Sequence, residues 1–348
     1  MSLGRDLERA VALLQAGELV AFPTETVYGL GADASNPQAV AKIFAAKERP
    51  ADHPLIVHLP GADVLAHWAC EIPDTAYRLA AAFWPGPLTL ILKRHERVPQ
   101  EVTGGQETIG LRVPDHRLAL ALLRAFDEAE GGRGVGIAAP SANRFGRISP
   151  TQAAHVREEL GARVALILDG GPCAVGIEST IVDLSAGTPR ILRPGVLSAA
   201  ALAQVLGQPV VVASGSAVSQ VASPRVSGSL AAHYAPRIPL RLVAGAALIE
   251  TLQQVTRDGR RCFVLAHGVP LPASLPAGAS WQGMAPDAAG YAHDLYTRLR
   301  QADQGSFDLI LVEQVSATDE TWRAVADRLA RAACGSGNAE QGRDAGSS

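Results

Sequence analysis

The chain has 348 residues, carries a formal net charge of −3 and is 47% hydrophobic by residue count. This length predicts roughly two domains with a large buried core. The acidic balance excludes a protein that coats nucleic acid by bulk electrostatics, so any RNA contact is expected to be local. The cysteines are far apart and form no Cys-x-x-Cys pair, which predicts neither a zinc site nor a disulfide framework.

The polar start of the chain, and the lack of an apolar run near the ~20 residues of a membrane span, predict neither a signal peptide nor a transmembrane helix. We therefore expect a reducing, cytoplasmic environment.

Residues 1–206 alternate between strand-like and helix-like patterns, which predicts an α/β domain with a mixed sheet. Asn36-Pro37 is typical of a helix start, and Pro50 requires that helix to stop near Arg49. The expected strands are 19–22, 55–59, 88–92, 108–113, 135–138, 164–168, 180–184 and 190–192, and the other expected helices are 5–16, 73–83, 115–129 and 150–160.

The rest of the chain divides into three parts. Residues 207–238 are rich in small residues and proline, which predicts a short strand at 210–213 followed by a long linker. Residues 239–334 alternate strands (240–244, 262–266, 307–312) with helices (246–257, 287–301, 319–334), which predicts a small three-layer domain with parallel strands. Residues 335–348 are Gly- and Ser-rich and are expected to be a disordered tail.

Hydroxyl groups and cations gather at predicted strand ends and turns of the first domain, a combination that binds phosphates and carboxylates well. Taken singly, such hydroxyls are more often turn or capping residues. Arg112 is harder to explain structurally, because an arginine on an apolar strand needs an anionic partner. The group comprises Thr24, Thr26, Thr108, Ser141, Ser149, Ser179, Thr180, Lys47, Arg49, Arg112 and Arg193.

No nucleophile elbow or pair of catalytic carboxylates is evident, and His58, taken alone, would be a buried core histidine. A magnesium role is conceivable for Glu25 and Glu178. The set favours catalysis by positioning and charge stabilisation, as in phosphoryl or nucleotidyl transfer.

Several ordered motifs resemble the YrdC-type threonylcarbamoyl-AMP synthases in their long, two-domain form. The resemblance is strong over about the first 236 residues and rests on layout alone beyond them. It implies a YrdC-like twisted mixed sheet and a smaller Rossmann-like C-terminal domain. The motifs are 22–31, 47–55, 111–114, 139–143, 176–180, 192–195 and His233-Tyr234-Ala235-Pro236.

The resemblance implies that L-threonine, bicarbonate and ATP, the last with Mg²⁺, are condensed into threonylcarbamoyl-AMP and pyrophosphate. The product would supply the tRNA threonylcarbamoyl transferase machinery, with direct tRNA contact possible but not required. The implied threonine-binding residues are Thr26, His58, Arg112, Ala139 and Ser179. The implied ATP-binding residues are Arg49, His53, Thr108, Ser141, Ser149, Arg193 and Tyr234, and the implied catalytic residues are Lys47, Arg49, Ser141 and Asn143; metal ligands are not indicated.

Two alternatives are weighed against this interpretation. A non-catalytic RNA-binding module could use the same basic cleft, but only 5% of the residues are aromatic and no stacking platform is evident. The second alternative is the related carbamoyl-transfer enzyme of hydrogenase maturation, which would need extra domains and paired-cysteine zinc fingers that this sequence lacks. Two departures from the family pattern stand out: His53 replaces a common asparagine, and residues 226–230 lack a common Pro-Gly pair.

Overall fold

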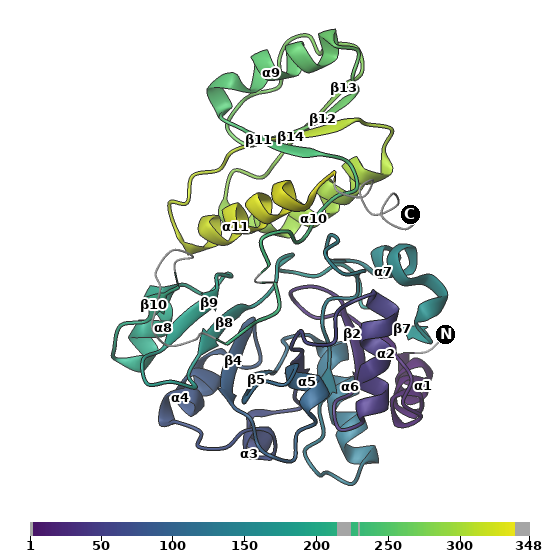
Figure 1. The fold of residues 1–348 in the computed structure, drawn as a ribbon, viewed down its shortest axis with the longest axis vertical. Helices are drawn as coiled ribbons and strands as arrows, with labels where there is room; N and C mark the ends of the chain where they lie inside the picture. The colour runs from purple at the N-terminus through teal and green to yellow at the C-terminus, as the bar shows by residue number, and fades with distance from the viewer. Residues whose placement is uncertain (1–2, 214–223, 229, 338–348) are drawn as a thin grey trace, which may run out of the picture. The chain divides into compact units, whose positions relative to one another are not determined.

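The computed structural model describes residues 3–213, 224–228 and 230–337. The described chain forms two compact units (Figure 1): the first comprises residues up to 145 and from 149 to 229, and the second comprises 146–148 and the residues from 230 onward. The predicted tail lies largely outside the described residues. No helix among those described is both long and apolar enough to cross a bilayer.

The first unit is built on a mixed sheet that contains ten strands within the described residues. Strand β3 lies between β5, to which it is parallel, and β6, to which it is antiparallel. The sheet order is β10-β9-β8-β4-β5-β3-β6-β2-β1-β7. The strands are β1 (Val20–Phe22), β2 (Gly29–Asp33), β3 (Ile56–His58), β4 (Leu88–Lys93), β5 (Thr108–Arg112), β6 (Ile137–Ala138), β7 (Leu166–Ile167), β8 (Thr180–Asp183), β9 (Arg190–Arg193) and β10 (Val211–Val212).

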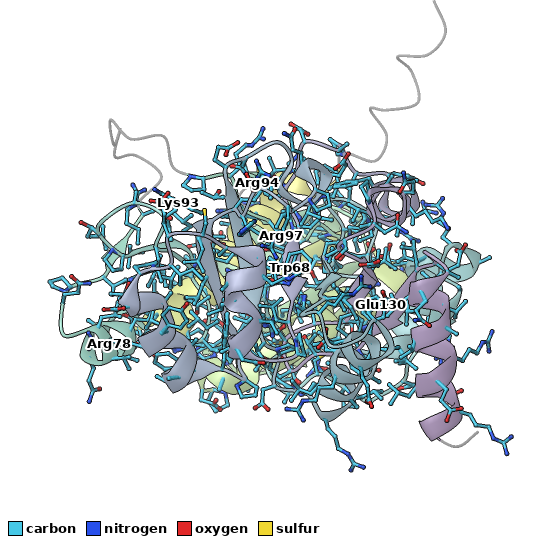
Figure 2. The ribbon with its side chains drawn as sticks, turned by 90° about the horizontal axis from the view of Figure 1, so that it is seen from below. Trp68, Arg78, Lys93, Arg94, Arg97 and Glu130 are labelled. Atoms are coloured by element: carbon cyan, nitrogen blue, oxygen red, sulfur yellow. The ribbon has the colours of Figure 1, made fainter. Side chains whose placement is uncertain are left out.

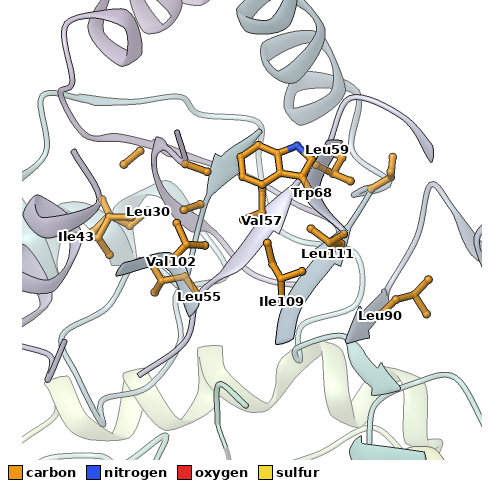
Figure 3. Packing of buried hydrophobic residues seen from close by; sticks show 14 of the residues in the cluster. Leu30, Ile43, Leu55, Val57, Leu59, Trp68, Leu90, Val102, Ile109 and Leu111 are labelled. Carbon is orange, nitrogen blue, oxygen red and sulfur yellow. The ribbon is translucent and has the colours of Figure 1, made fainter. Parts of the chain in front are cut away.

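Successive side chains of a strand point to opposite faces, so apolar residues of this sheet lie on both faces, and helices cover each of them. On one face, Leu30, Val57 and Leu111 enter the large core around Trp68 (Figure 3). On the other face, Val20 and Phe22 pack with α1 and α6. The helices are α1 (Leu3–Gln15), α2 (Pro37–Lys47), α3 (Leu65–Trp68), α4 (Asp74–Phe83), α5 (Gln100–Thr103), α6 (Arg117–Ala129), α7 (Ala153–Leu160) and α8 (Ala199–Leu206), with 3₁₀ turns Ala62–Val64 and Gly161–Arg163.

Trp68, at the end of α3, anchors the short helical segment that follows β3 (Figure 2). Its side chain is 1% exposed, and its indole N–H donates to the carbonyl oxygen of Gly134 at 2.8 Å. This bond joins α3, which follows β3, to the turn before β6, one of the two strands that pair with β3, the strand that carries His58.

The second unit is a parallel sheet of four described strands in the order β11-β14-β12-β13. Helix α9 lies on one face, and α10 and α11 lie on the other (Figure 1). The elements are β11 (Leu240–Val243), α9 (Gly245–Arg257), β12 (Cys262–Ala266), β13 (Ala279–Gly283), α10 (Ala288–Gln304), β14 (Leu309–Glu313) and α11 (Glu320–Gly335).

The predicted fold class is confirmed: a mixed-sheet α/β unit precedes a smaller, parallel α/β unit. The sequence analysis missed β2, β13, α3, α5 and α8. Strand β2 was missed because its Gly-Leu-Gly-Ala-Asp sequence has low β-propensity. It forms because β1 and β6 pair with it on either side.

Candidate active site

A row of polar side chains lies on the sheet face opposite the large core. In β5, Ile109 and Leu111 enter that core, so the alternation of the strand directs Thr108 and Arg112 to the other face. His58 of β3 is the register partner of Arg112 and lies beside it on the same face. Thr108 and Arg112 are four residues apart, or about 13 Å along the strand, so they mark two ends of one polar surface.

At one end of this surface, Arg112 is held by a carboxylate. Its guanidinium Nη2 lies 2.7 Å from Oε2 of Glu25, and both side chains are more than nine-tenths buried. Its Nε also donates to the carbonyl oxygen of Gly86 at 3.3 Å. The anionic partner that the sequence required for Arg112 is therefore present within the protein, in the turn after β1.

That turn is shaped by its own hydroxyl groups. The Thr24 hydroxyl donates to the carbonyl oxygen of Val27 at 2.6 Å, and it lies 2.8 Å from the Thr26 hydroxyl. Residue 25 is further fixed because Val175 N donates to the Glu25 carbonyl oxygen at 2.7 Å. The Thr-Glu-Thr sequence thus forms an ordered turn that aims Glu25 at Arg112.

His58 is neutral at physiological pH. It is 3% exposed, and its ring meets the Phe22 ring edge to face with 5.9 Å between the centroids. Burial, followed by the neighbouring Arg112 charge, lowers the pKa of His58 to about 3. The Arg112 end of the surface therefore contains a neutral imidazole beside an arginine–carboxylate pair.

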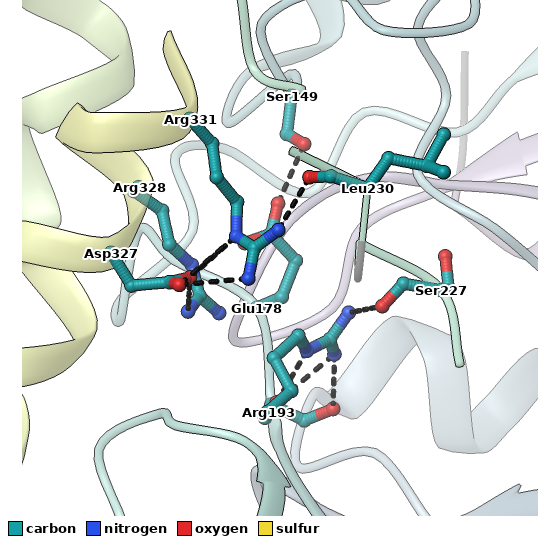
Figure 4. A network of polar contacts seen from close by, with 9 residues as sticks. Ser149, Glu178, Arg193, Ser227, Leu230, Asp327, Arg328 and Arg331 are labelled. Atoms are coloured by element: carbon teal, nitrogen blue, oxygen red, sulfur yellow. Dashed lines mark hydrogen bonds and ion pairs between the residues drawn. The ribbon is translucent and has the colours of Figure 1, made fainter. Parts of the chain in front are cut away.

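Ser179 lies at the start of β8, where two neighbours fix its hydroxyl. The hydroxyl is 2.8 Å from that of Thr89 in β4, and Arg193 of β9 donates to it at 3.1 Å. Arg193 also donates to the carbonyl oxygen of Ser227 at 2.9 Å (Figure 4). Arg193 therefore links the hydroxyl cluster of the sheet to a residue within the predicted linker.

The residue before Ser179 is also engaged. The Ser149 hydroxyl, which is fully buried, donates to Oε1 of Glu178 at 2.6 Å (Figure 4). This bond brings the segment after Asn143 to the residues just before β8, nearly thirty residues further along the chain.

Lys47 fixes a turn formed by Ser141, Ala142 and Asn143. Its ammonium, on a side chain that is 2% exposed, donates to the carbonyl oxygen of Ser141 at 2.5 Å and to that of Asn143. Burial, followed by the Arg49 charge, lowers the pKa of Lys47 well below its usual range. The backbone N–H of Ala142 donates to Tyr28, so this turn also contacts the segment before β2.

Arg49 lies just beyond the end of α2. The helix ends because Glu48 adopts a left-handed conformation (φ 56°), and Arg49 N then donates to the carbonyl oxygen of Phe44. The Arg49 guanidinium lies 5.9 Å from the centroid of the Phe145 ring and donates to the carbonyl oxygen of Pro54 at 3.0 Å. The His53 ring contacts the same phenyl ring at 5.2 Å.

A small hollow of about 10 Å³ lies over the Thr108 end of the polar surface. Val226 covers it and packs on Ile91 and Ile181, two residues of the same sheet face. Arg225 fixes this cover by donating from its backbone N–H to Gln106 Oε1 at 2.7 Å and from its guanidinium to the carbonyl oxygen of Gly104 at 2.9 Å. We call residues 225–227 the strap.

Two further predicted residues make other contacts. Ala139 follows β6, and its backbone N–H donates to the carbonyl oxygen of Ile56. Tyr234 belongs to the second unit, where its ring stacks on Tyr296 at 5.7 Å and lies under the Arg328 guanidinium. Its positive φ of 59° is unusual for an aromatic residue. The roles of Ala139 and Tyr234 remain predictions.

The structure adds residues that the sequence analysis did not assign. Glu25 was considered only for magnesium, although its place between two threonines was visible. Thr89 was missed, yet a threonine within an otherwise aliphatic strand was a signal. Phe145 and the strap carried no pattern that sequence reasoning could use.

The carboxylates of the polar surface contact other protein groups. Among the described residues, no three His, Cys, Asp or Glu side chains cluster in a way that could hold a metal ion. Glu25 is paired with Arg112, and Glu178 accepts from Ser149.

The arginine, imidazole and hydroxyl groups of this polar surface lie on one face of the mixed sheet, opposite the large core. Residues 12–195 match a family model described as "Telomere recombination" (Sua5, YciO and YrdC), and residues 197–334 match one described as "Threonylcarbamoyl-AMP synthase, C-terminal domain". The chain belongs to the threonylcarbamoyl-AMP synthase family, a family of nucleotidyltransferases of tRNA modification, in its long two-domain form.

Similar proteins match over nearly the whole chain. The threonylcarbamoyl-AMP synthase of Bacillus subtilis is 40% identical over 332 residues, which cover 94% of this chain and 93% of the relative. The Pyrococcus abyssi synthase is 39% identical and covers 88% of each chain. The crystal structure of P. abyssi Sua5 complexed with L-threonine superposes with a TM-score of 0.86 at 35% identity, and the match covers 96% of each chain.

Proposed function

We propose that the chain condenses L-threonine, bicarbonate and ATP into threonylcarbamoyl-AMP, with release of pyrophosphate. The observation that supports this most is the two-ended polar surface. Arg112 and His58 lie at one end, and Thr108 lies at the other under the strap. About 13 Å separates the ends, which gives room for an amino acid and a nucleotide to meet on one sheet face.

Threonine would bind at the Arg112 end. Arginine binds carboxylates in a bidentate fork, so Arg112 would share its guanidinium between Glu25 and the carboxylate of threonine. Thr26 and Ser179 would donate or accept at the polar groups of the substrate, and Ala139 would contribute its backbone. Because His58 is neutral, it places no second positive charge beside the threonine amine, which must itself be neutral to attack.

The first step would join the threonine nitrogen to the carbon of bicarbonate with loss of water, which gives a carbamate. A carbamate oxygen would then attack the α-phosphorus of ATP in line. The new O–P bond forms as the bond to the bridging oxygen of pyrophosphate breaks. Magnesium that enters with ATP would offset charge on the phosphates.

ATP would bind toward the Thr108 end and the turn after β6. Arg49, Arg193, Ser141, Asn143 and Ser149 supply cations and hydrogen-bonding groups there, and His53 lies against Phe145 beside Arg49. Lys47 would fix the Ser141–Asn143 turn as well as add positive charge. Donors that are fixed before the reaction stabilise developing charge without reorganisation during the step.

The strap would act as part of a lid. The hollow has a volume of only about 10 Å³, far below the roughly 300–1,000 Å³ of typical small-molecule pockets, so residues 225–227 must move for ATP to enter. Closure behind the substrates would keep water from the carbamate, which loses CO₂ easily. The role of Tyr234 in the same lid is part of this proposal.

Threonylcarbamoyl-AMP would pass to the transferase that modifies tRNA, with no tRNA contact required of this chain. We assign the reaction to the cytoplasm, where ATP, threonine and tRNA are available together.

The test measures pyrophosphate release and identifies the nucleotide product by mass spectrometry. We expect release that requires both threonine and bicarbonate, together with a product of the mass of threonylcarbamoyl-AMP. Release without threonine, or RNA binding without any release, would refute the proposal, and the second result would favour the RNA-binding alternative.

A further inference from the structure

Three residues of the turn that joins Asn143 to Ser149 belong to the second unit. Gly146, Arg147 and Ile148 group with residues 230 onward, whereas Phe145 and Ser149 group with the first unit. The chain therefore enters and leaves the second unit between two proposed nucleotide-binding residues. Residues 146–148 can fix the ends of this turn only if hydrogen bonds or ion pairs hold them to the rest of the second unit.

Hydrogen bonds hold the backbone of residues 146–148 at both ends. Ala235 N donates to the carbonyl oxygen of Gly146 at 2.8 Å, and Arg147 and Ala235 form a parallel β-bridge. At the other end, the guanidinium of Arg300 in α10 donates to the carbonyl oxygen of Ile148. The side chain of Ile148 is itself 2% exposed.

Asp303, one turn after Arg300 on α10, joins the segment to the chain that leads into β11. Its Oδ2 accepts from Arg147 at 2.9 Å, with the two side chains only 10% and 19% exposed. Its Oδ1 accepts from the backbone N–H groups of Arg237 at 2.5 Å and Ile238 at 3.1 Å. One carboxylate therefore fixes Arg147 and the end of the predicted linker to the same helix.

We propose that Asp303 is a positioning residue for the nucleotide half of the site. It acts through Arg147, which is only two residues from Ser149 and four from Asn143. The Asn143 carbonyl accepts from Lys47, and the Ser149 hydroxyl donates to Glu178, so both ends of the turn hold site groups. Asp303 would thus fix the middle of a turn whose two ends carry site groups, without supplying a reacting group itself.

A purely structural ion pair would predict a different result. Loss of such a pair would lower the stability of the second unit and leave the affinity for each substrate unchanged. A positioning role instead predicts a selective effect on ATP, because Ser149 and Asn143 lie on the nucleotide side and Arg112 and His58 do not. Misplacement of a binding group by about 1 Å can cost as much as 10²-fold in rate.

The experiment compares Asp303→Asn with Asp294→Asn in the full-length chain. Asp294 is a matched control because it also lies on α10 and pairs there with Arg298 at 3.7 Å, on the same helix. Arg147→Gln removes the other partner of the Asp303 pair and replaces D303N if that variant does not fold. Amide hydrogen exchange over residues 144–149 is read first, followed by KM for ATP and for threonine.

We expect D303N and R147Q to raise exchange in 144–149 severalfold and to raise KM for ATP about tenfold, with KM for threonine within about twofold of wild type. D294N should match wild type in the exchange of 144–149, in KM for ATP and in KM for threonine. Exchange in D303N and R147Q equal to that of D294N, or equal rises in both KM values, would overturn the inference.

The ATP arm rests on the proposed function, whereas the exchange arm does not. If wild-type protein releases no pyrophosphate, the proposed function fails and the exchange of 144–149 still decides whether Asp303 positions this turn.

Discussion

Replacing Lys47 by methionine tests the turn that Ser141 and Asn143 form. Methionine nearly fills the volume of the lysine stem, so the cavity contribution is small. The variant removes the Lys47 donor from the carbonyl groups of Ser141 and Asn143, of which the Ser141 carbonyl still accepts from the Asn143 backbone N–H at 3.0 Å. Loss of the donor to a buried carbonyl costs about 1–3 kcal/mol, so the Asn143 carbonyl alone predicts a loss of about 1–3 kcal/mol in the free energy of unfolding of the first unit.

Lys42 provides the control on the same helix. Its side chain is 43% exposed and pairs with Glu18 at 2.7 Å, and exposed pairs of this kind contribute about 0–1 kcal/mol. Urea unfolding followed by circular dichroism, with pyrophosphate release measured in parallel, should therefore separate Lys47→Met from Lys42→Met. Release should fall by about 10²-fold in K47M, because the turn would no longer be held in place. A K47M variant within about 0.5 kcal/mol of K42M, and equally active, would refute the reasoning.

Three further predictions concern the polar surface and the strap. Arg112→Lys should raise KM for threonine at least about tenfold because lysine lacks the bidentate fork of arginine, while Arg190→Lys on the same sheet should not raise it. Equal KM values for threonine in the two variants would contradict this prediction. Burial holds the pKa of His58 at about 3, below the pKa of histidine in the unfolded chain. Wild type should therefore lose about 1 kcal/mol more free energy of unfolding between pH 6 and pH 5 than His58→Gln does. Parallel pH profiles of the two proteins in urea unfolding would refute this prediction. Val226→Ser should loosen the strap and admit water, whose attack on the α-phosphorus gives AMP and pyrophosphate, so the ratio of pyrophosphate to threonylcarbamoyl-AMP should rise severalfold, unlike the same change at exposed Val211; an unchanged ratio would count against a lid.

Much of the fold was predictable because local patterns and tertiary packing agree. Alternating apolar residues identified β4 and β5, and Asn36-Pro37 identified the start of α2, whose Asn36 side chain accepts from the backbone N–H groups of Gln38 and Ala39. Strand β2 was not predictable, because its glycines disfavour a strand and only pairing with two neighbours stabilises it.

Individual site residues were easier to identify than their partners. Arg112 stood out as a charge on an apolar strand, and its need for an anion followed from burial alone. That Glu25 meets this need could not be known, because the contact depends on how a turn after β1 meets β5. The strap is a similar case: Val226 contacts Ile91 and Ile181 across long sequence separations, and residues 224–228 show no periodicity.

A crystal structure with L-threonine and a non-hydrolysable ATP analogue would test most directly whether one sheet face holds both substrates. We predict the threonine carboxylate on the Arg112 guanidinium and the nucleotide phosphates beside the Ser141–Asn143 turn, with the amine directed toward the α-phosphorus. Threonine bound away from Arg112, or a nucleotide seated on other elements with no shared surface between the two ligands, would contradict the account.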